Sequence, residues 1–260
     1  MSNDLILTQR DGDIVTVVLN RPHKLNALTK PMWQRLGEAM RELSSDDLVR
    51  CIVVRGAGDK SFAPGNDISE FESTRATSAQ AREYGHVHHE ALAALYECRH
   101  PVVALIKGIC VGGGLEIASL CDLRICGSSG RFGIPINKLG LSAGVAEIQA
   151  LVRMSSRAVA LELLLEGRVI GAQEAYQKGL VTRVVPDEKV EEEAYATARR
   201  IADGAPLVAR LHKQFMRRLD EGGPITPADI DLAYPCYDTE DFKTGYRAFL
   251  AKTKPEFKGR

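Results

Sequence analysis

The stretch of sequence best suited to chemistry is KGICVGGGLEIASLCDLRI, from Lys107 to Ile125. Three consecutive glycines, Gly112 to Gly114, come shortly before Glu116, where a strand-like run leads into a short helix. The first N–H groups of a helix lack intrahelical partners and carry the positive end of its dipole, and glycine lets a ligand approach them. Such donors suit an oxygen that becomes negative during a reaction. A carboxylate beside them suits proton abstraction next to a carbonyl.

The glycine run is also compatible with two simpler roles. The glycines could permit close packing of strand and helix, with Glu116 favouring the start of the helix. A dinucleotide site fits less well, because Ile117 stands where the third glycine of GxGxxG belongs. The packing role stays open beside the catalytic one.

A second loop of similar character is KSFAPGNDISEF, from Lys60 to Phe71, which follows the strand-like CIVVRG. In a parallel sheet, ligands gather at the carboxyl ends of the strands. Two such loops can each supply one backbone N–H to the same oxygen, which is what an enolate requires.

The surrounding pattern predicts the elements that position these loops. LILTQR and IVTVVLN flank DGD and predict a hairpin, and Thr29 is expected to cap a helix with one apolar face. The strands RCIVVRG, PVVALIKG and DLRICG alternate with helices, the first running from about Ala79 to Glu97. This alternation predicts an α/β fold with parallel pairings. Later helices are expected at Ser142–Glu166, Asp187–Ala202, Pro206–Glu221 and Asp241–Ala251.

Composition excludes several classes of function. The 260 residues carry 34 basic and 34 acidic side chains, so the formal net charge of zero offers no footprint for nucleic acid or an anionic membrane. No apolar run is long enough for a membrane span, and the N-terminus does not read as a signal peptide. The 6 cysteines form no CxxC pair. Reduced, mainly buried thiols and a cytoplasmic location are therefore expected.

Six segments together resemble the crotonase (enoyl-CoA hydratase/isomerase) superfamily over essentially the whole chain. They are NRPHKLNALT, SFAPGNDISEF, HPVVALIKGICVGGGLEIASLCDLRI, RFGIPINKLGL, GRVIGAQEAYQKGLVTRVVP and AFLAKTKPEFK. The resemblance implies a crotonase-like spiral of ββα units over residues 1–200 and a helical trimerisation part over residues 201–260. It also implies a homotrimer, or a hexamer built as a dimer of trimers.

The same resemblance implies an acyl-CoA thioester substrate and no separate cofactor, since coenzyme A is part of the substrate. The N–H groups of Asn66 and Gly113 would hold the thioester enolate, and Glu116 would be the acid/base. Matched positions at the substrate or CoA are Lys24, Ala63, Asp67, Ile68, Ile136, Phe249 and Lys252.

One position departs from the hydratase pattern. Hydratases of this family carry a second glutamate in a segment like FGxPE, where this chain has Ile136. Loss of one member of a catalytic pair commonly costs orders of magnitude in rate, so efficient hydration is in doubt. One carboxylate can still isomerise a double bond. Decarboxylation, retro-aldol cleavage, hydrolysis of an acyl-CoA, or weakly catalytic acyl-CoA binding remain alternatives.

Other polar residues are candidates for assistance. Glu147 borders the acyl pocket in related chains, and His86, His88 and His89 lie on a helix over the same region. His86 and His89 share a helical face, but no further ligands stand nearby and no metal is expected. The GLSAG segment fits a serine-hydrolase pattern, but it has no clear preceding strand and only His212 downstream.

Overall fold

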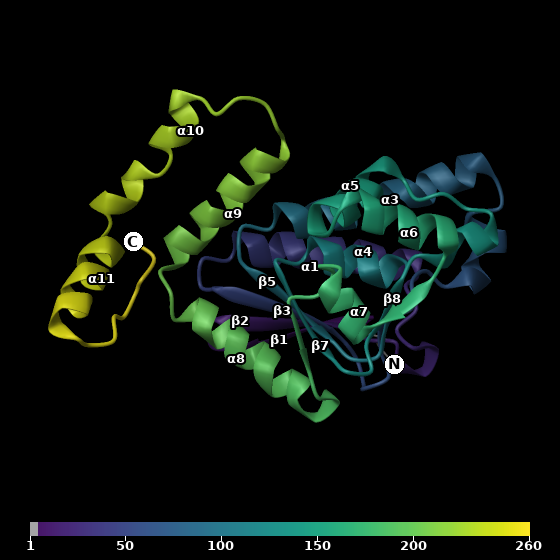
Figure 1. Cartoon of the computed structure of the whole chain (residues 1–260), viewed down its shortest axis with the longest axis horizontal. Helices are drawn as coiled ribbons and strands as arrows, with labels where there is room; N and C mark the ends of the chain where they lie inside the picture. The colour runs from purple at the N-terminus through teal and green to yellow at the C-terminus, as the bar shows by residue number, and fades with distance from the viewer. Residues whose placement is uncertain (1–4) are drawn as a thin grey trace.

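The computed structural model describes residues 5–260, which form two sheets and a series of helices (Figure 1). The larger sheet has six strands in the order β1-β2-β3-β5-β7-β10, and the smaller has the order β4-β6-β8-β9. The strands are β1 (Ile6–Asp11), β2 (Ile14–Leu19), β3 (Cys51–Gly56), β4 (Ser61–Ala63), β5 (Val102–Ile106), β6 (Ile109–Val111), β7 (Leu123–Gly127), β8 (Arg131–Gly133), β9 (Val169–Gly171) and β10 (Arg183–Val185).

The α-helices surround these sheets. They are α1 (Lys30–Ser45), α2 (Phe71–Thr74), α3 (Ser78–Glu97), α4 (Gly113–Leu120), α5 (Val145–Met154), α6 (Arg157–Glu166), α7 (Ala172–Gln177), α8 (Val190–Ala202), α9 (Pro206–Asp220), α10 (Pro227–Asp231) and α11 (Glu240–Ala251).

The predicted hairpin and parallel pairings are confirmed. β1 and β2 pair antiparallel, and every other pairing in the larger sheet is parallel. The predicted cap of α1 is also present, because the side-chain oxygen of Thr29 accepts a hydrogen bond from the Met32 N–H.

Both faces of the larger sheet are covered, which explains the nearly continuous apolar strands. Alternate residues of β3 point to opposite faces. Cys51 and Val53 belong to the cluster packed on α8, whereas Ile52 and Val54 belong to the cluster that includes side chains of α1, α3 and α4. Figure 1 shows α8 on one side of the sheet and α1 and α3 on the other.

The smaller sheet was not anticipated, because its four strands have only three residues each. Such short strands leave no periodic signal in the sequence. β6 lies between β4 and β8 and leads directly into α4, so this sheet fixes where Glu116 is presented.

One predicted helix is wrong in extent. The segment expected to be helical from Ser142 to Glu166 is two helices, and the first begins only at Val145. Ser155 leaves the helical conformation, and Ser156 caps α6 by accepting a hydrogen bond from the Val159 N–H at 3.2 Å. Serine side chains compete with the helix for backbone hydrogen bonds. Ser155 therefore ends α5, and Ser156 starts α6.

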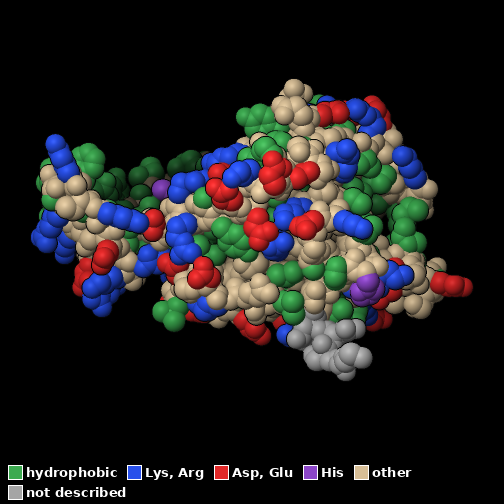
Figure 2. Space-filling view, turned by 90° about the horizontal axis from the view of Figure 1, so that it is seen from below, with side chains coloured by type: hydrophobic (Ala, Val, Ile, Leu, Met, Phe, Trp, Pro, Cys, Tyr) green, Lys and Arg blue, Asp and Glu red, His purple; other side chains and the backbone are tan. Residues whose placement is uncertain are grey.

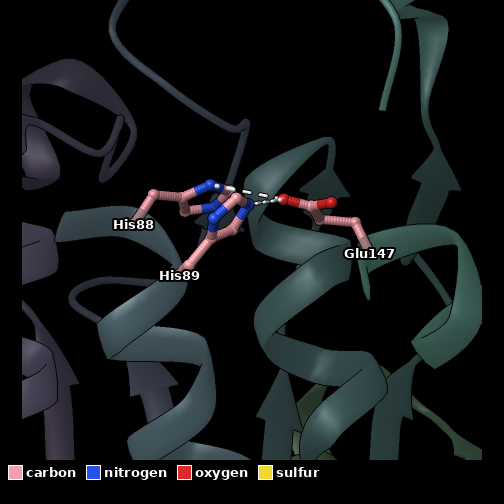
Figure 3. Close-up of side chains that lie close together, drawn as sticks. All are labelled: His88, His89 and Glu147. Carbon is pink, nitrogen blue, oxygen red and sulfur yellow. Dashed lines mark hydrogen bonds and ion pairs between the residues drawn. The ribbon is translucent and has the colours of Figure 1, made fainter. Parts of the chain in front are cut away.

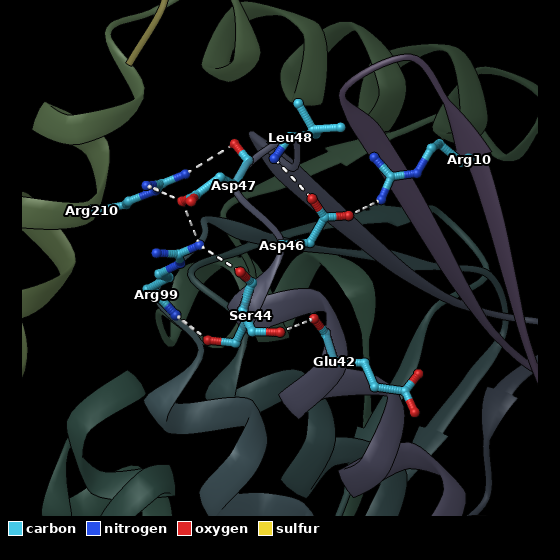
Figure 4. A network of polar contacts seen from close by, with 9 residues as sticks. Arg10, Glu42, Ser44, Asp46, Asp47, Leu48, Arg99 and Arg210 are labelled. Atoms are coloured by element: carbon cyan, nitrogen blue, oxygen red, sulfur yellow. Dashed lines mark hydrogen bonds and ion pairs between the residues drawn. The ribbon is translucent and has the colours of Figure 1, made fainter. Parts of the chain in front are cut away.

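The C-terminal helices α9 to α11 extend away from the sheets (Figure 1). Their surface exposes several large apolar side chains, including Tyr234, Tyr237, Phe242, Phe249 and Leu250. At its base, α9 is joined to the core by Arg210, which donates to the Asp47 carboxylate at 3.3 Å; Arg99 donates to the same oxygen at 2.8 Å (Figure 4).

The distribution of surface charge and the state of the cysteines agree with what the composition predicts. On the face seen in Figure 2, basic and acidic side chains are interspersed over the body of the molecule. Among the helices of residues 5–260, none has both the length and the apolar character needed to cross a bilayer. Five cysteines are buried, Cys236 is partly exposed, and all six are free thiols.

We predict that His100 makes the fold sensitive to acid. Its side chain is fully buried, and burial, together with the charges of Arg210 and Arg99, lowers its pKa to about 4. The unfolded chain, with an ordinary histidine pKa near 6.5, binds this proton first, so stability is lost as the pH falls from about 6.5 to about 4.

The measurement is urea unfolding at pH 7 and pH 5. The parent should lose at most about 2 kcal/mol of unfolding free energy from this residue, and His100→Leu should lose correspondingly less. Equal losses in the two proteins would show that His100 is not the acid-sensitive group.

Candidate active site

The loop after β4 and the start of α4 lie in direct contact. Gly112 caps α4 with a φ of +53°, and Gly65 has a φ of +107°. A Cβ atom on Gly65 would lie only 3.3 Å from the backbone nitrogen of Gly113. The contact therefore places Asn66, which follows Gly65, next to the first turn of α4.

The two predicted backbone donors have no protein acceptors. Across residues 5–260, neither the Asn66 N–H nor the Gly113 N–H donates a hydrogen bond to another residue. The side chain of Asn66 is held by neighbouring helices, because its Oδ1 accepts from Trp33 Nε1 at 2.6 Å and from the Tyr84 hydroxyl at 3.2 Å. Asn66 also lines the cavity described below.

Close packing also accounts for the glycine run. A Cβ on Gly113 would lie 3.0 Å from the Trp33 ring, and one on Gly114 would overlap the carbonyl oxygen of Ala63. The packing role and the donor role are thus compatible, since the contact that requires glycine also brings the donors close together.

Glu116 lies in the first turn of α4 and forms a hydrogen bond with a buried histidine. The distance from Glu116 Oε2 to His88 Nε2 is 2.9 Å, and both side chains are largely buried. The His88 ring packs edge-on against Trp33 with ring centroids 4.3 Å apart. Because an ionised carboxylate only accepts hydrogen bonds, Nε2 donates whenever Glu116 is ionised.

A second carboxylate continues this network on the other side of His88. Glu147 Oε1 lies 3.6 Å from His88 Nδ1 and 2.9 Å from His89 Nε2. Figure 3 shows both rings, from α3, directed toward Glu147 on α5. The Glu147 side chain is buried, and its Oε2 has no hydrogen-bond partner within the described chain. Two carboxylates therefore meet at one histidine.

The same side chains offer ligand atoms to a metal ion. One atom each from His88, His89 and Glu147 lie within 4.8 Å of one another. Hydrogen bonds and ion pairs already account for this arrangement, and the other nitrogen of His88 is engaged by Glu116. His86 lies three residues before His89 on the same helix and is exposed, as His89 is, but it is not part of this group.

Glu116, His88 and Glu147 line a cavity of about 240 Å³. Its lining includes Asn66, Gly112 and Glu116, with His88 and Glu147 beside them. The part of the lining that comes from the segment after β8 is mostly apolar and includes Pro135, Ile136, Leu139, Leu141 and Ala143. The cavity thus combines titratable side chains with an apolar segment.

The other predicted site residues are distributed unevenly. Ile68 and Ile136 line the cavity. Gly113, which follows the lining residue Gly112 in the chain, is buried, and Ala63 is fully buried. Lys24, Phe249 and Lys252 are exposed and lie outside this cavity.

Asp67 is not among the residues that line this cavity. Its carboxylate forms an ion pair with Arg21 at 2.8 Å. Hydrogen bonding from Ser69 and from Arg21 lowers the Asp67 pKa to about 2. In this structure the Asp67 carboxylate, through its contacts with Arg21 and Ser69, stabilises the loop that carries Asn66.

Sequence reasoning missed two features of the site. It did not place His88 between the two glutamates, because that contact joins residues 28 positions apart on different helices. It also gave no attention to Arg75, which lines the cavity from the loop before α3. A lone arginine in a polar loop carries no recognisable signal.

Comparison with known proteins places the chain in a family. Residues 9–260 match the family described as Enoyl-CoA hydratase/isomerase. The short-chain-enoyl-CoA hydratase of Clostridium acetobutylicum is 34% identical over 265 aligned positions, covering 99% of each chain.

Solved structures agree. An enoyl-CoA hydratase/carnithine racemase from Magnetospirillum magneticum is 47% identical and superposes with a TM-score of 0.97, covering 100% of this chain and 97% of that one. An enoyl-CoA hydratase from Bacillus anthracis is 29% identical with a TM-score of 0.90, covering 98% and 99%. The fold is thus that of the crotonase superfamily. The chain belongs to the enoyl-CoA hydratase/isomerase family and is an enzyme of that family.

We predict that Gly114→Ala strongly destabilises the protein. The added Cβ overlaps the Ala63 carbonyl oxygen and must push α4 from β4, at a cost of about 1–3 kcal/mol or more. The matched control is Gly85→Ala on α3, where the nearest atom is 4.0 Å away and alanine should stabilise the helix by about 0.5–1 kcal/mol. Urea unfolding measures both. Equal stability of the two variants would contradict the packing described here.

Proposed function

We propose that this enzyme acts on acyl-CoA thioesters through an enolate, with Glu116 as the single proton carrier. One observation carries the proposal: Glu116, Asn66 and Gly112, the N-cap residue of α4, line one cavity. The Asn66 and Gly113 N–H groups would stabilise the thioester oxygen as it becomes negative, and Glu116 would remove or return a proton at the neighbouring carbon. No separate cofactor is part of this proposal.

His88 has a positioning role in this proposal. Its N–H to Glu116 Oε2 would fix the carboxylate and leave the other oxygen for the substrate. Glu147 Oε1 lies 3.6 Å from the other nitrogen of His88 and would attract the ring only when that nitrogen also carries a proton. This support matters because Ile136, which also lines the cavity, occupies the sequence position of the second glutamate.

The apolar Ile136 wall favours moving a proton between two carbons, which is isomerisation of the acyl double bond. A second candidate, hydration, is favoured by one observation: Glu147 lines the same cavity, and its buried Oε2 has no hydrogen-bond partner within residues 5–260. Such an oxygen can hold a water molecule. In that case Glu147 would take the place of the missing glutamate.

The proposal extends to the assembly. Residues 201–260 would form the trimerisation part of a homotrimer or a dimer of trimers, because α9 to α11 expose many apolar side chains that a partner would cover. Phe249 and Lys252 would then reach the CoA of a neighbouring copy. Lys24 would lie at the CoA nucleotide.

We predict that Glu116→Gln slows turnover by orders of magnitude. Purified protein is mixed with a short trans-2-enoyl-CoA and, separately, with its 3-enoyl isomer, and the conjugated thioester absorbance is followed. The parent should be active on the 3-enoyl substrate, and the variant should be about 10²–10⁴-fold slower because the proton carrier is gone.

Glu90→Gln, an exposed change of the same type on α3, is the control and should leave the rates unchanged. Inactivity of the parent on both substrates, or full activity of Glu116→Gln, would contradict the proposal. Hydration that is lost in Glu147→Gln, with isomerisation retained, would favour the second candidate.

We also predict that His88→Leu lowers kcat by about 10–100-fold, the usual worth of a hydrogen bond to a charged group, with little change in KM. His88→Gln, which can still donate an N–H, should recover part of the rate. His86→Leu on the exposed side of α3 is the control. A matching loss of activity in His88→Leu and His88→Gln, with both folded by circular dichroism, would exclude the positioning role.

A further inference from the structure

Arg75 brings a positive charge into the cavity that also contains Glu116. It follows directly after α2, and its guanidinium carbon lies 3.6 Å from the centroid of the Tyr84 ring and 5.1 Å from that of Phe71. Stacking on two aromatic rings fixes the plane of the guanidinium group. The side chain is thus held in place at the cavity wall.

No carboxylate pairs with this cation. In the part of the chain that the structure describes, Arg75 has no acidic oxygen within ion-pair distance, and its Nε is buried with no hydrogen-bond acceptor. Arginine nevertheless stays protonated in proteins. Burial of this donor without an acceptor is unfavourable, and an anion that enters the cavity would compensate the charge.

The acidic groups near Arg75 are engaged elsewhere. Glu116 is hydrogen-bonded to His88, and Glu70 Oε2 accepts from the Lys30 N–H at 3.1 Å. Tyr84 stays neutral, because burial raises the pKa of its hydroxyl to about 12. The carboxylates of Glu116 and Glu70 therefore attract Arg75 without pairing with it, and the Tyr84 hydroxyl that contacts it is neutral.

We propose that Arg75 binds a carboxylate at the distal end of the substrate's acyl group, so that the substrate is a dicarboxylic acyl-CoA monothioester. This inference rests on the proposed acyl-CoA function and narrows its substrate class. The planar fork of arginine matches a carboxylate with two parallel hydrogen bonds. The walls beside it, which include Ile68 and Phe71, would contact the methylene chain.

The size of the cavity is compatible with a short acyl group. About 240 Å³ corresponds to roughly eight water molecules at ~30 Å³ each. A chain of four or five carbons that ends in a carboxylate fits this space. A second cavity of about 480 Å³ also borders Glu116 and Glu147, so the choice of a dicarboxylic chain rests on Arg75 rather than on volume.

The test measures binding by isothermal titration calorimetry, so it does not depend on turnover. Succinyl-CoA and glutaryl-CoA are compared with 4-methylpentanoyl-CoA and 5-methylhexanoyl-CoA, in which an isopropyl group replaces the carboxylate at nearly the same shape. The parent should bind at least one dicarboxylic ester about tenfold or more tightly than its isostere, as expected for hydrogen bonds to a charged group.

Arg75→Gln should remove this preference and leave the affinity for the isosteres within about twofold. Arg75→Lys should keep part of the preference, since it keeps the charge without the fork. The control is Arg41→Gln, an exposed change of equal charge on α1, which should leave all four affinities unchanged. Circular dichroism checks that each variant is folded.

Failure of this inference and failure of the proposed function give different results. Equal binding of the dicarboxylic esters and their isosteres by the parent, or a preference that survives Arg75→Gln, overturns the inference alone. The same holds if Arg75→Gln weakens all four esters equally, because Arg75 would then act only through Glu116. Absence of binding by any CoA ester overturns both.

Discussion

The contact between the end of β4 and the first turn of α4 is the constraint on which the site depends. At Gly114 there is no room for even one methyl group, because a Cβ would overlap the Ala63 carbonyl oxygen. The same contact sets Gly65 against Gly112 and so brings the Asn66 and Gly113 N–H groups near each other. A helix start, a strand end and a loop are thereby fixed by backbone contact alone. In the proposed function, a site that must stabilise a developing negative charge benefits from this rigidity, because donors that are already oriented need no reorganisation during the reaction.

A network of titratable side chains is built onto this backbone frame. Glu116, His88 and Glu147 come from three different helices and are held in line by contacts of 2.9 Å and 3.6 Å. Trp33 packs against His88 and also donates to the Asn66 side chain, so the histidine that holds Glu116 and the loop residue Asn66 share one supporting residue. This sharing couples the position of the proposed proton carrier to that of the proposed enolate site. It also explains how a chain with Ile136 in place of a second glutamate can still keep its remaining carboxylate oriented.

Local signals in the sequence predicted much of the fold and part of the site. The hairpin, the Thr29 cap and the parallel strands follow from turn residues, capping and apolar runs, and all are confirmed. Glu116 and Ile136 stood out by motif, and both line the cavity. The smaller sheet was missed because three-residue strands have no period, and the break at Ser155 was missed because the apolar pattern runs through it. His88 and Arg75 could not be found, since their roles depend on contacts between distant segments. No linear pattern records such contacts.

In the proposed function, Glu116 forms a thioester enolate at the donors of Asn66 and Gly113, and this step can be tested without knowledge of the natural substrate. A saturated acyl-CoA, such as butyryl-CoA or glutaryl-CoA, is incubated with the enzyme in D₂O, and deuterium at the carbon next to the thioester is followed by NMR. We expect incorporation with the parent protein and only the uncatalysed background with Glu116→Gln. Background exchange with the parent for both esters, or undiminished exchange in the variant, would contradict enolate formation by Glu116.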